Sequence, residues 1–86
     1  MTPEPDEVPG GPVPTVDARG LRCPAPVIAL ARAARGAPAG TEITVLATDP
    51  AAQHDVPAWA RMRGHVVVGS SQDGDVLRMT VRLGEG

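Results

Sequence analysis

The sequence predicts an α+β two-layer sandwich with the element order β-α-β-α-β-β, a four-stranded mixed sheet and both helices on one face. Three observations predict this fold class. Two segments carry apolar residues at helical spacing, four segments are rich in β-forming residues, and the last strand alternates apolar with polar side chains. A β-α-β unit joins parallel strands, and a polar strand face leaves only the opposite face for the helices.

The first half of the chain is expected to hold a strand, a helix and a second strand. Residues 15–18, TVDA, form a short strand of β-forming residues. Residues 24–35 have apolar side chains at i, i+3, i+4 and i+7, and Gly36 supplies the helix stop. Residues 41–48, TEITVLAT, are apolar on both faces, which predicts a central strand. The helical stripe consists of Val27, Leu30, Ala31 and Ala34.

The second helical region carries two start signals. Asp49 stands before Pro50, and Asp55 renews the signal six residues later. We therefore expect one helical turn, a break near Asp55 and a second helix to about Arg63. Trp59 is expected either in the core, which we favour, or as an anchor at its rim.

Two strands are expected to complete the sheet. The segments HVVVGS and DVLRMTVRL are joined by SQDG, in which Asp73-Gly74 is a hairpin signal. In the last strand, Leu77 and Met79 alternate with Arg78 and Thr80, so one face is expected to be buried and the other exposed.

The N-terminal residues differ in composition from the rest. Residues 1–13 are rich in Pro, Gly and acid, which predicts a disordered tail before a single domain at 14–86. They lack the basic start and apolar run of a secretory signal, and no apolar stretch approaches the roughly 18 residues that span a membrane. We expect a cytoplasmic protein, and the net charge of −2 argues against nucleic-acid binding.

Cys23, the only cysteine, excludes an internal disulfide. Pro24 favours an extended Cys23 and suits the first helical position, so the thiol is expected at the helix N-cap. Because Pro24 and Pro26 lack N–H groups, Ala25 and Val27 keep the amides that would face the sulfur.

These amides, the helix dipole, Arg22 and Arg19 would lower the pKa of the thiol and make it a nucleophile. The alternative is a buried, unreactive cysteine. No C-x-x-C pair is present, and the spacing of the cysteine from His54 and His65 fits no common metal site.

Several motifs together resemble the TusA/SirA-like family of sulfur carrier proteins. They are VDARGLRCPAPVIALARAAR, then DP at 49–50, DVP at 55–57 and GH at 64–65, and the resemblance covers about residues 15–83. It implies the same two-layer fold and a sulfurtransferase that carries sulfane sulfur as a persulfide on Cys23. A cysteine desulfurase or rhodanese-like protein would donate the sulfur, and a downstream protein would accept it for tRNA thiolation, sulfur metabolism or molybdoenzyme maturation. We expect no cofactor and a monomer.

The chain departs from many members of that family at Ala60, where they have a second cysteine after the aromatic residue. Because the turns after parallel strands open at one sheet edge, Asp49 and Asp55 are expected on the side of Cys23, either as helix caps or beside the sulfur. A carboxylate near the sulfur would oppose ionisation. Arg19 and Arg22 either steer an acidic partner or solvate their loop. The alternative function is a partner-binding or regulatory module with a structural Cys23.

Overall fold

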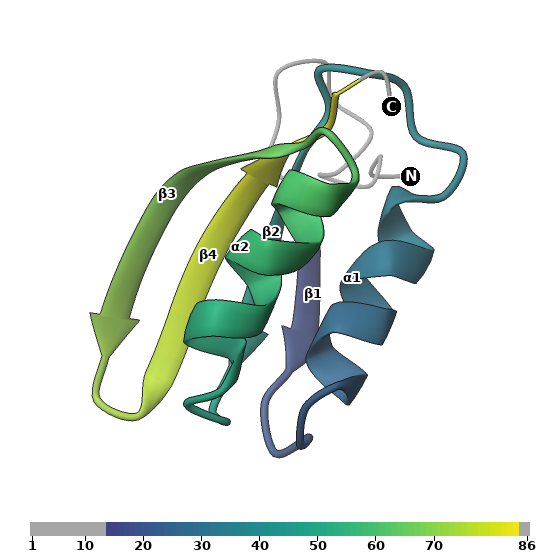
Figure 1. The fold of residues 1–86 in the computed structure, drawn as a ribbon. Helices are drawn as coiled ribbons and strands as arrows, with labels where there is room; N and C mark the ends of the chain where they lie inside the picture. Colours follow the sequence, from purple (N-terminus) through teal and green to yellow (C-terminus); the bar gives the residue numbers. More distant parts are fainter. Residues whose placement is uncertain (1–13, 85–86) are drawn as a thin grey trace, which may run out of the picture.

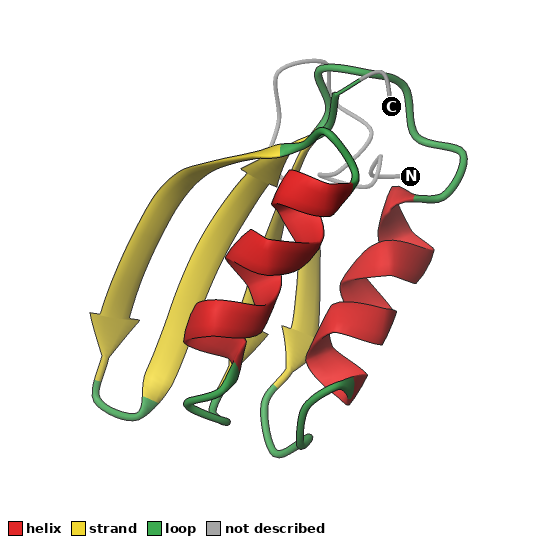
Figure 2. Cartoon of the chain, viewed as in Figure 1, coloured by secondary structure: helices red, strands yellow, loops and turns green. Residues whose placement is uncertain are grey.

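The structure, a computed structural model, describes residues 14–84, and the predicted tail at 1–13 lies outside the described residues. Within the described range, four strands and two helices follow the predicted order (Figure 1, Figure 2). Their bounds are Thr15–Ala18 (β1), Ala25–Ala34 (α1), Glu42–Ala47 (β2), Ala52–Met62 (α2), Val66–Asp73 (β3) and Val76–Arg82 (β4).

The sheet is mixed and has the strand order β1-β2-β4-β3. β1 runs parallel to β2, whereas β4 runs antiparallel to both of its neighbours. β2 is therefore a central strand, as its apolar faces predict. Both helices cover the same face of the sheet (Figure 1), so the predicted α+β two-layer sandwich is confirmed.

The core lies between the helices and the covered face of the sheet. Ile43 and Val81 enter it from the sheet, and Leu30 enters it from α1. The other three members of the predicted α1 stripe pack against this core. Trp59 of α2 is only 8% exposed, which confirms the favoured core position. The chain has no Phe or Tyr, so Trp59 is its largest aromatic side chain.

The uncovered face of the sheet is more polar. Thr44 and Thr80 share a hydroxyl hydrogen bond of 2.7 Å, and Arg82 forms an ion pair with Glu42 at 3.2 Å. Buried and more exposed residues alternate along β4, as predicted. Thr44 is itself buried with its hydroxyl paired to Thr80, whereas the Arg82–Glu42 pair is exposed to solvent.

The predicted break near Asp55 is wrong, because α2 continues through Asp55 and contains Pro57. A proline inside a helix removes one backbone hydrogen bond and costs about 3 kcal/mol. The same helix buries Val56, Trp59 and Ala60, and this apolar burial offsets the lost bond.

The hairpin turn lies one residue later than the Asp73-Gly74 signal indicates. β3 continues to Asp73, which pairs with Val76, so Ser71 and Gln72 belong to the strand and not to a loop. Gly74 takes the first turn position with φ +62°, and glycine adopts this conformation without a steric penalty.

Candidate functional site

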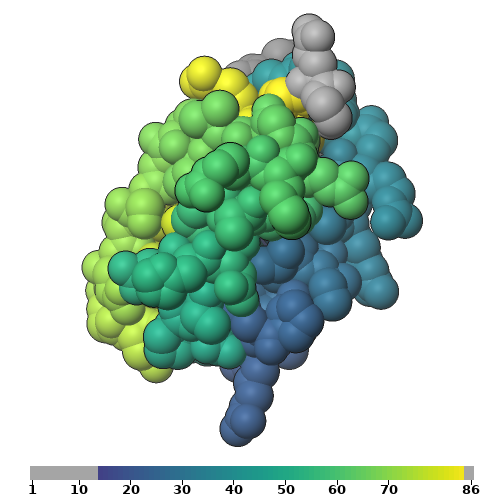
Figure 3. Space-filling model, in the orientation of Figure 1, coloured from purple at the N-terminus to yellow at the C-terminus, as the bar shows by residue number. Residues whose placement is uncertain are grey.

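Cys23 lies in the loop between β1 and α1, at one end of the sandwich (Figure 1). Gly20, with φ +83°, reverses the chain after β1, and its N–H donates to Thr48 Oγ1 at 2.9 Å. This contact ties the loop to the end of β2. In the space-filling view, the segment between β1 and α1 projects from the body of the molecule (Figure 3).

The expected N-cap position of Cys23 is wrong. Pro24 is the N-cap of α1, with φ −92° and ψ 12°, and no side chain caps this helix. Since Pro24 has non-helical dihedral angles, the helix begins at Ala25, whose N–H donates to Arg22 O at 2.8 Å. Cys23 therefore lies one residue further from the helix amides than the sequence indicates.

The residues after the cysteine anchor the site to the core. Pro26 is buried, and Val27 and Cys23 itself pack against the core. The sequence predicts only that Pro26 removes an N–H donor from the first turn. In the structure, the buried Pro26 ring also fixes the first turn of α1 by packing. Cys23 is partly buried and its thiol is free.

Asp49 joins the loops that follow the two parallel strands. Its Oδ2 accepts a hydrogen bond from Cys23 N at 2.8 Å, and its Oδ1 accepts one from Ala51 N at 2.9 Å. These bonds, followed by the charge of Arg22, lower the pKa of the Asp49 carboxyl. The expectation that Asp49 lies on the side of Cys23 is confirmed, and one carboxylate both supports the start of α2 and holds the backbone of the cysteine.

The expected fall in the pKa of the thiol is wrong. Burial, then a hydrogen bond with Asp55 and its negative charge, then the charge of Asp49, raise the pKa of Cys23 to about 11. Asp55 lies in the first turn of α2 and is not its cap, because the N-cap is Ala51. The expected position of Asp55 near the sulfur is confirmed, and the thiol is protonated at neutral pH.

Arg19 does not act on the thiol. Its Nε donates to Asp17 Oδ1 at 2.8 Å, and a second guanidinium nitrogen donates to Asp17 Oδ2 at 2.7 Å. The pKa of Asp17 falls to about 2 through these bonds. Asp17 was not among the predicted site residues, although its position two residues before Arg19 is a visible signal for this local pair.

Two exposed apolar side chains flank the cysteine in sequence and were not predicted as site residues. Leu21 is 44% exposed and Ile28 is 46% exposed. Leu21 and Arg22 also line a shallow hollow of about 440 Å³, together with Asp49. The sequence offers a signal for both. Ile28 lies in α1 but outside its apolar stripe, and Leu21 is an apolar residue in the loop before the helix.

Neither histidine is among the groups that shift the pKa of Cys23. His54 is exposed on α2, and His65 lies after α2, where its ring is 5.0 Å from that of Trp59. Residues 14–84 hold no group of three or more His, Cys, Asp or Glu side chains that could bind a metal ion. No helix in that range is long and apolar enough to cross a membrane.

Comparisons with known proteins give one consistent family. The family model for sulfurtransferase TusA matches residues 14–83. The putative sulfur carrier protein YrkI of Bacillus subtilis is 33% identical over 69 residues, which cover 80% of this chain and 92% of YrkI. The putative sulfur carrier protein YrkF of the same organism is 35% identical over 69 residues, or 80% of this chain, which spans only 37% of YrkF.

The fold comparison agrees. The crystal structure of a SirA-like protein from Desulfitobacterium hafniense matches with a TM-score of 0.72 and 32% sequence identity, over 83% of this chain and 97% of that one. The family match thus includes every strand and helix described above. The chain belongs to the TusA family of sulfur carrier proteins.

Proposed function

We propose that this protein accepts sulfane sulfur as a persulfide on Cys23 and relays it to an acceptor protein. The observation that carries the proposal is the position of the chain's only thiol. It lies at the end of the sandwich where both parallel strands end, with exposed Leu21 and Ile28 close to it in the chain. A protein that only passes sulfur between partners needs one accessible thiol and a docking surface, and no second cysteine or metal.

In this proposal, Asp55 accepts the proton that Cys23 must lose before it can react. The free protein holds an inert thiol, which protects it from unwanted oxidation because the thiolate is the reactive form. During loading, the Cys23 proton passes to the Asp55 carboxylate, and the resulting thiolate attacks the outer sulfur of the donor persulfide. The bond between the two donor sulfurs breaks, the donor cysteine leaves as a thiolate, and a new S–S bond forms on Cys23.

Release uses the same chemistry, with Cys23 now in the role of the sulfur donor. An acceptor thiolate attacks the outer sulfur of the Cys23 persulfide, and Cys23 leaves as a thiolate that takes back a proton. The donor is a cysteine desulfurase or a rhodanese-like protein, the site of action is the cytoplasm, and the delivered sulfur serves tRNA thiolation, sulfur metabolism or molybdoenzyme maturation. The names of YrkI and YrkF as putative sulfur carriers support the general role.

Intact-mass analysis tests the loading step. After incubation of the full chain with a cysteine desulfurase and cysteine, or with a persulfide-loaded rhodanese, we expect the mass to increase by one sulfur atom. Reduction should remove the increase, and Cys23→Ser should never show it. If neither donor class adds sulfur, the proposal is wrong.

The partial burial and the protonated state of the thiol favour one second candidate, a partner-binding module in which Cys23 is structural. That function predicts that Cys23→Ser binds its partners with unchanged affinity and that the wild-type protein gains no sulfur from any donor. Pull-down of partners with wild-type protein and Cys23→Ser, combined with the mass measurement, separates the two functions.

A further inference from the structure

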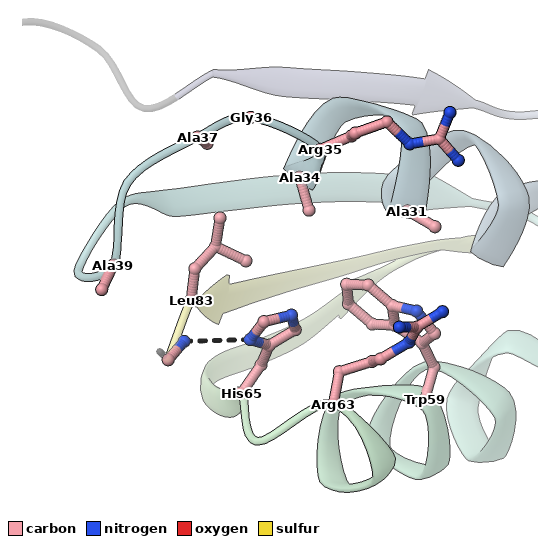
Figure 4. A pocket seen from close by; sticks show the side chains of 11 residues that line it. Ala31, Ala34, Arg35, Gly36, Ala37, Ala39, Trp59, Arg63, His65 and Leu83 are labelled. Atoms are coloured by element: carbon pink, nitrogen blue, oxygen red, sulfur yellow. Dashed lines mark hydrogen bonds between the residues drawn. The ribbon is translucent and has the colours of Figure 1, made fainter. Parts of the chain in front are cut away.

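Both helices end at the end of the sandwich opposite the loop that holds Cys23 (Figure 1). A pocket lies there (Figure 4). Its volume is about 490 Å³, within the range of pockets that hold small molecules. The α1 wall contributes Ala34 and Arg35, and the α2 wall contributes Trp59 and Arg63, with Leu83 at the end of β4 between them. None of these residues takes part in the proposed sulfur transfer.

The polar side chains that line this pocket are hydrogen-bond donors. Arg35 and Arg63 carry guanidinium groups, and Trp59 carries an indole N–H. His65 Nδ1 accepts a hydrogen bond from Gly84 N at 2.9 Å, so the neutral imidazole carries its proton on Nε2. Figure 4 shows Nδ1 turned toward Gly84 and the other ring nitrogen turned away from it.

The two guanidinium groups of the pocket form no ion pair with a described residue. Among residues 14–84 the two ion pairs are Arg19–Asp17 and Arg82–Glu42, and neither includes Arg35 or Arg63. The described residues that line the pocket include no Asp or Glu. The side chains of Arg35, Arg63 and Trp59 form no hydrogen bond with a described residue. These donors can therefore serve an anion.

Backbone packing holds His65 in place. Its N–H donates to Ala60 O at 2.7 Å, and its ring packs against Trp59. A β-carbon on Gly84 would collide with the carbonyl oxygen of Gly64, so only glycine allows the close approach that brings its N–H to His65 Nδ1. A preorganised donor costs less entropy when it binds a ligand.

We propose that this pocket binds the phosphate or carboxylate group of a small molecule. Arg35 and Arg63 supply charge-assisted hydrogen bonds from the two walls, and the His65 Nε2–H and the indole N–H supply the neutral donors. The small apolar residues on the α1 side leave room for the rest of the molecule. The pocket is thus a ligand site separate from the thiol.

Trp59 makes the test direct, because it is the only tryptophan and the chain has no tyrosine. Intrinsic fluorescence of the full chain is followed during titration with inorganic phosphate in one arm and succinate in the other, at constant ionic strength set with sodium chloride. We expect a saturable change in one or both arms, and the arm that saturates at lower concentration identifies the preferred group.

Matched variants localise the response. Arg35→Gln and Arg63→Gln should each weaken binding about tenfold, as expected for loss of one charge-assisted hydrogen bond. The controls are Arg32→Gln on α1 and Arg61→Gln on α2, which are exposed but do not line the pocket and should leave affinity unchanged. Circular dichroism of each variant checks that the fold is retained.

Three results would overturn the proposal. The first is a response that does not saturate in either arm, and the second is an equal loss of affinity in the pocket and control variants. The third concerns the acidic residues Glu4, Asp6 and Glu7, which are neutralised together as Gln, Asn and Gln in the full chain. If saturable binding appears only in this triple variant, the pocket is filled by the chain itself and not by a separate molecule.

Discussion

The two ends of the sandwich place opposite charges at the helix termini. At the Cys23 end, Asp49 and Asp55 lie near the start of α2, where negative charge suits the helix dipole. At the other end, Arg35 and Arg63 follow the last turns of α1 and α2, where positive charge suits the dipole. The charges at each end thus favour helix stability. At the Cys23 end the carboxylates oppose ionisation of the thiol, whereas at the other end the arginines favour the proposed binding of an anion.

At the thiol end, the carboxylates that suit the helix oppose the chemistry of the sulfur. A helix dipole typically lowers the pKa of a nearby thiol by about one unit. The pKa of Cys23 nevertheless rises to about 11, so burial and the two carboxylates outweigh any dipole effect. In this protein, a position near a helix start does not by itself activate the cysteine, because burial and then the two carboxylates act in the opposite direction.

The largest expected effect is at the pocket end. Gly84→Ala places a β-carbon against the Gly64 carbonyl, and this overlap should destabilise the fold by about 1–3 kcal/mol. Chemical denaturation measures the loss, and the Trp59 fluorescence should change because His65 moves with Gly84. Gly69→Ala is the control, since its β-carbon would lie 3.8 Å from Thr80 Cβ, an ordinary contact. Equal stability of the two variants would contradict the described packing.

The next effect is at the thiol end. Asp55→Asn removes a negative charge beside Cys23, which should lower the pKa of the thiol by about one unit and raise the thiolate fraction about tenfold near neutral pH. Alkylation by iodoacetamide should accelerate accordingly. Loading from a donor persulfide should instead slow, because the proposed proton acceptor is lost. Asp75→Asn, in the exposed hairpin turn, should change neither rate, and acceleration of both rates in Asp55→Asn would exclude the proton-transfer role.

A third effect appears in the pH dependence of stability. The pKa of Cys23 is raised from 9.0 to about 11 in the folded state, so between these values the folded chain keeps a proton that the unfolded chain has lost. Stability should therefore fall as pH rises from about 9 to about 11. The chain has no Lys or Tyr to titrate in that window, so Cys23→Ser should flatten the curve. Identical curves would mean that the pKa of the thiol is not raised.

The smallest effect is expected at Arg19. Its guanidinium is occupied by the exposed pair with Asp17, so Arg19→Gln should leave the alkylation rate of Cys23 unchanged. A clear change in that rate would show that Arg19 acts on the sulfur after all. Arg22→Gln is the variant to compare with Arg19→Gln. The charge of Arg22 lowers the pKa of Asp49, and Asp49 accepts a hydrogen bond from the Cys23 backbone.

Local sequence patterns specify the order of the elements and most of their arrangement. The apolar stripe of α1, the apolar faces of β2 and the alternation along β4 are local patterns with a fixed period, and each was confirmed. Parallel pairing of β1 and β2 follows from the helix between them, and it correctly places Asp49 beside Cys23. The local errors, at Pro24 and in α2, arose where proline dihedral angles and core burial outweigh a start signal.

The electrostatics of the thiol and the pocket at the opposite end depend on contacts between separate elements of the fold. The pKa of Cys23 depends on Asp49 and Asp55, which are 26 and more residues away in the chain, and its sign follows from spatial distances that no local pattern specifies. The donor set of the pocket likewise joins Arg35 with Trp59, Arg63 and His65 from separate elements. Periodicity reveals which face of an element is buried, but charge acts through space, and only the folded chain brings these groups together.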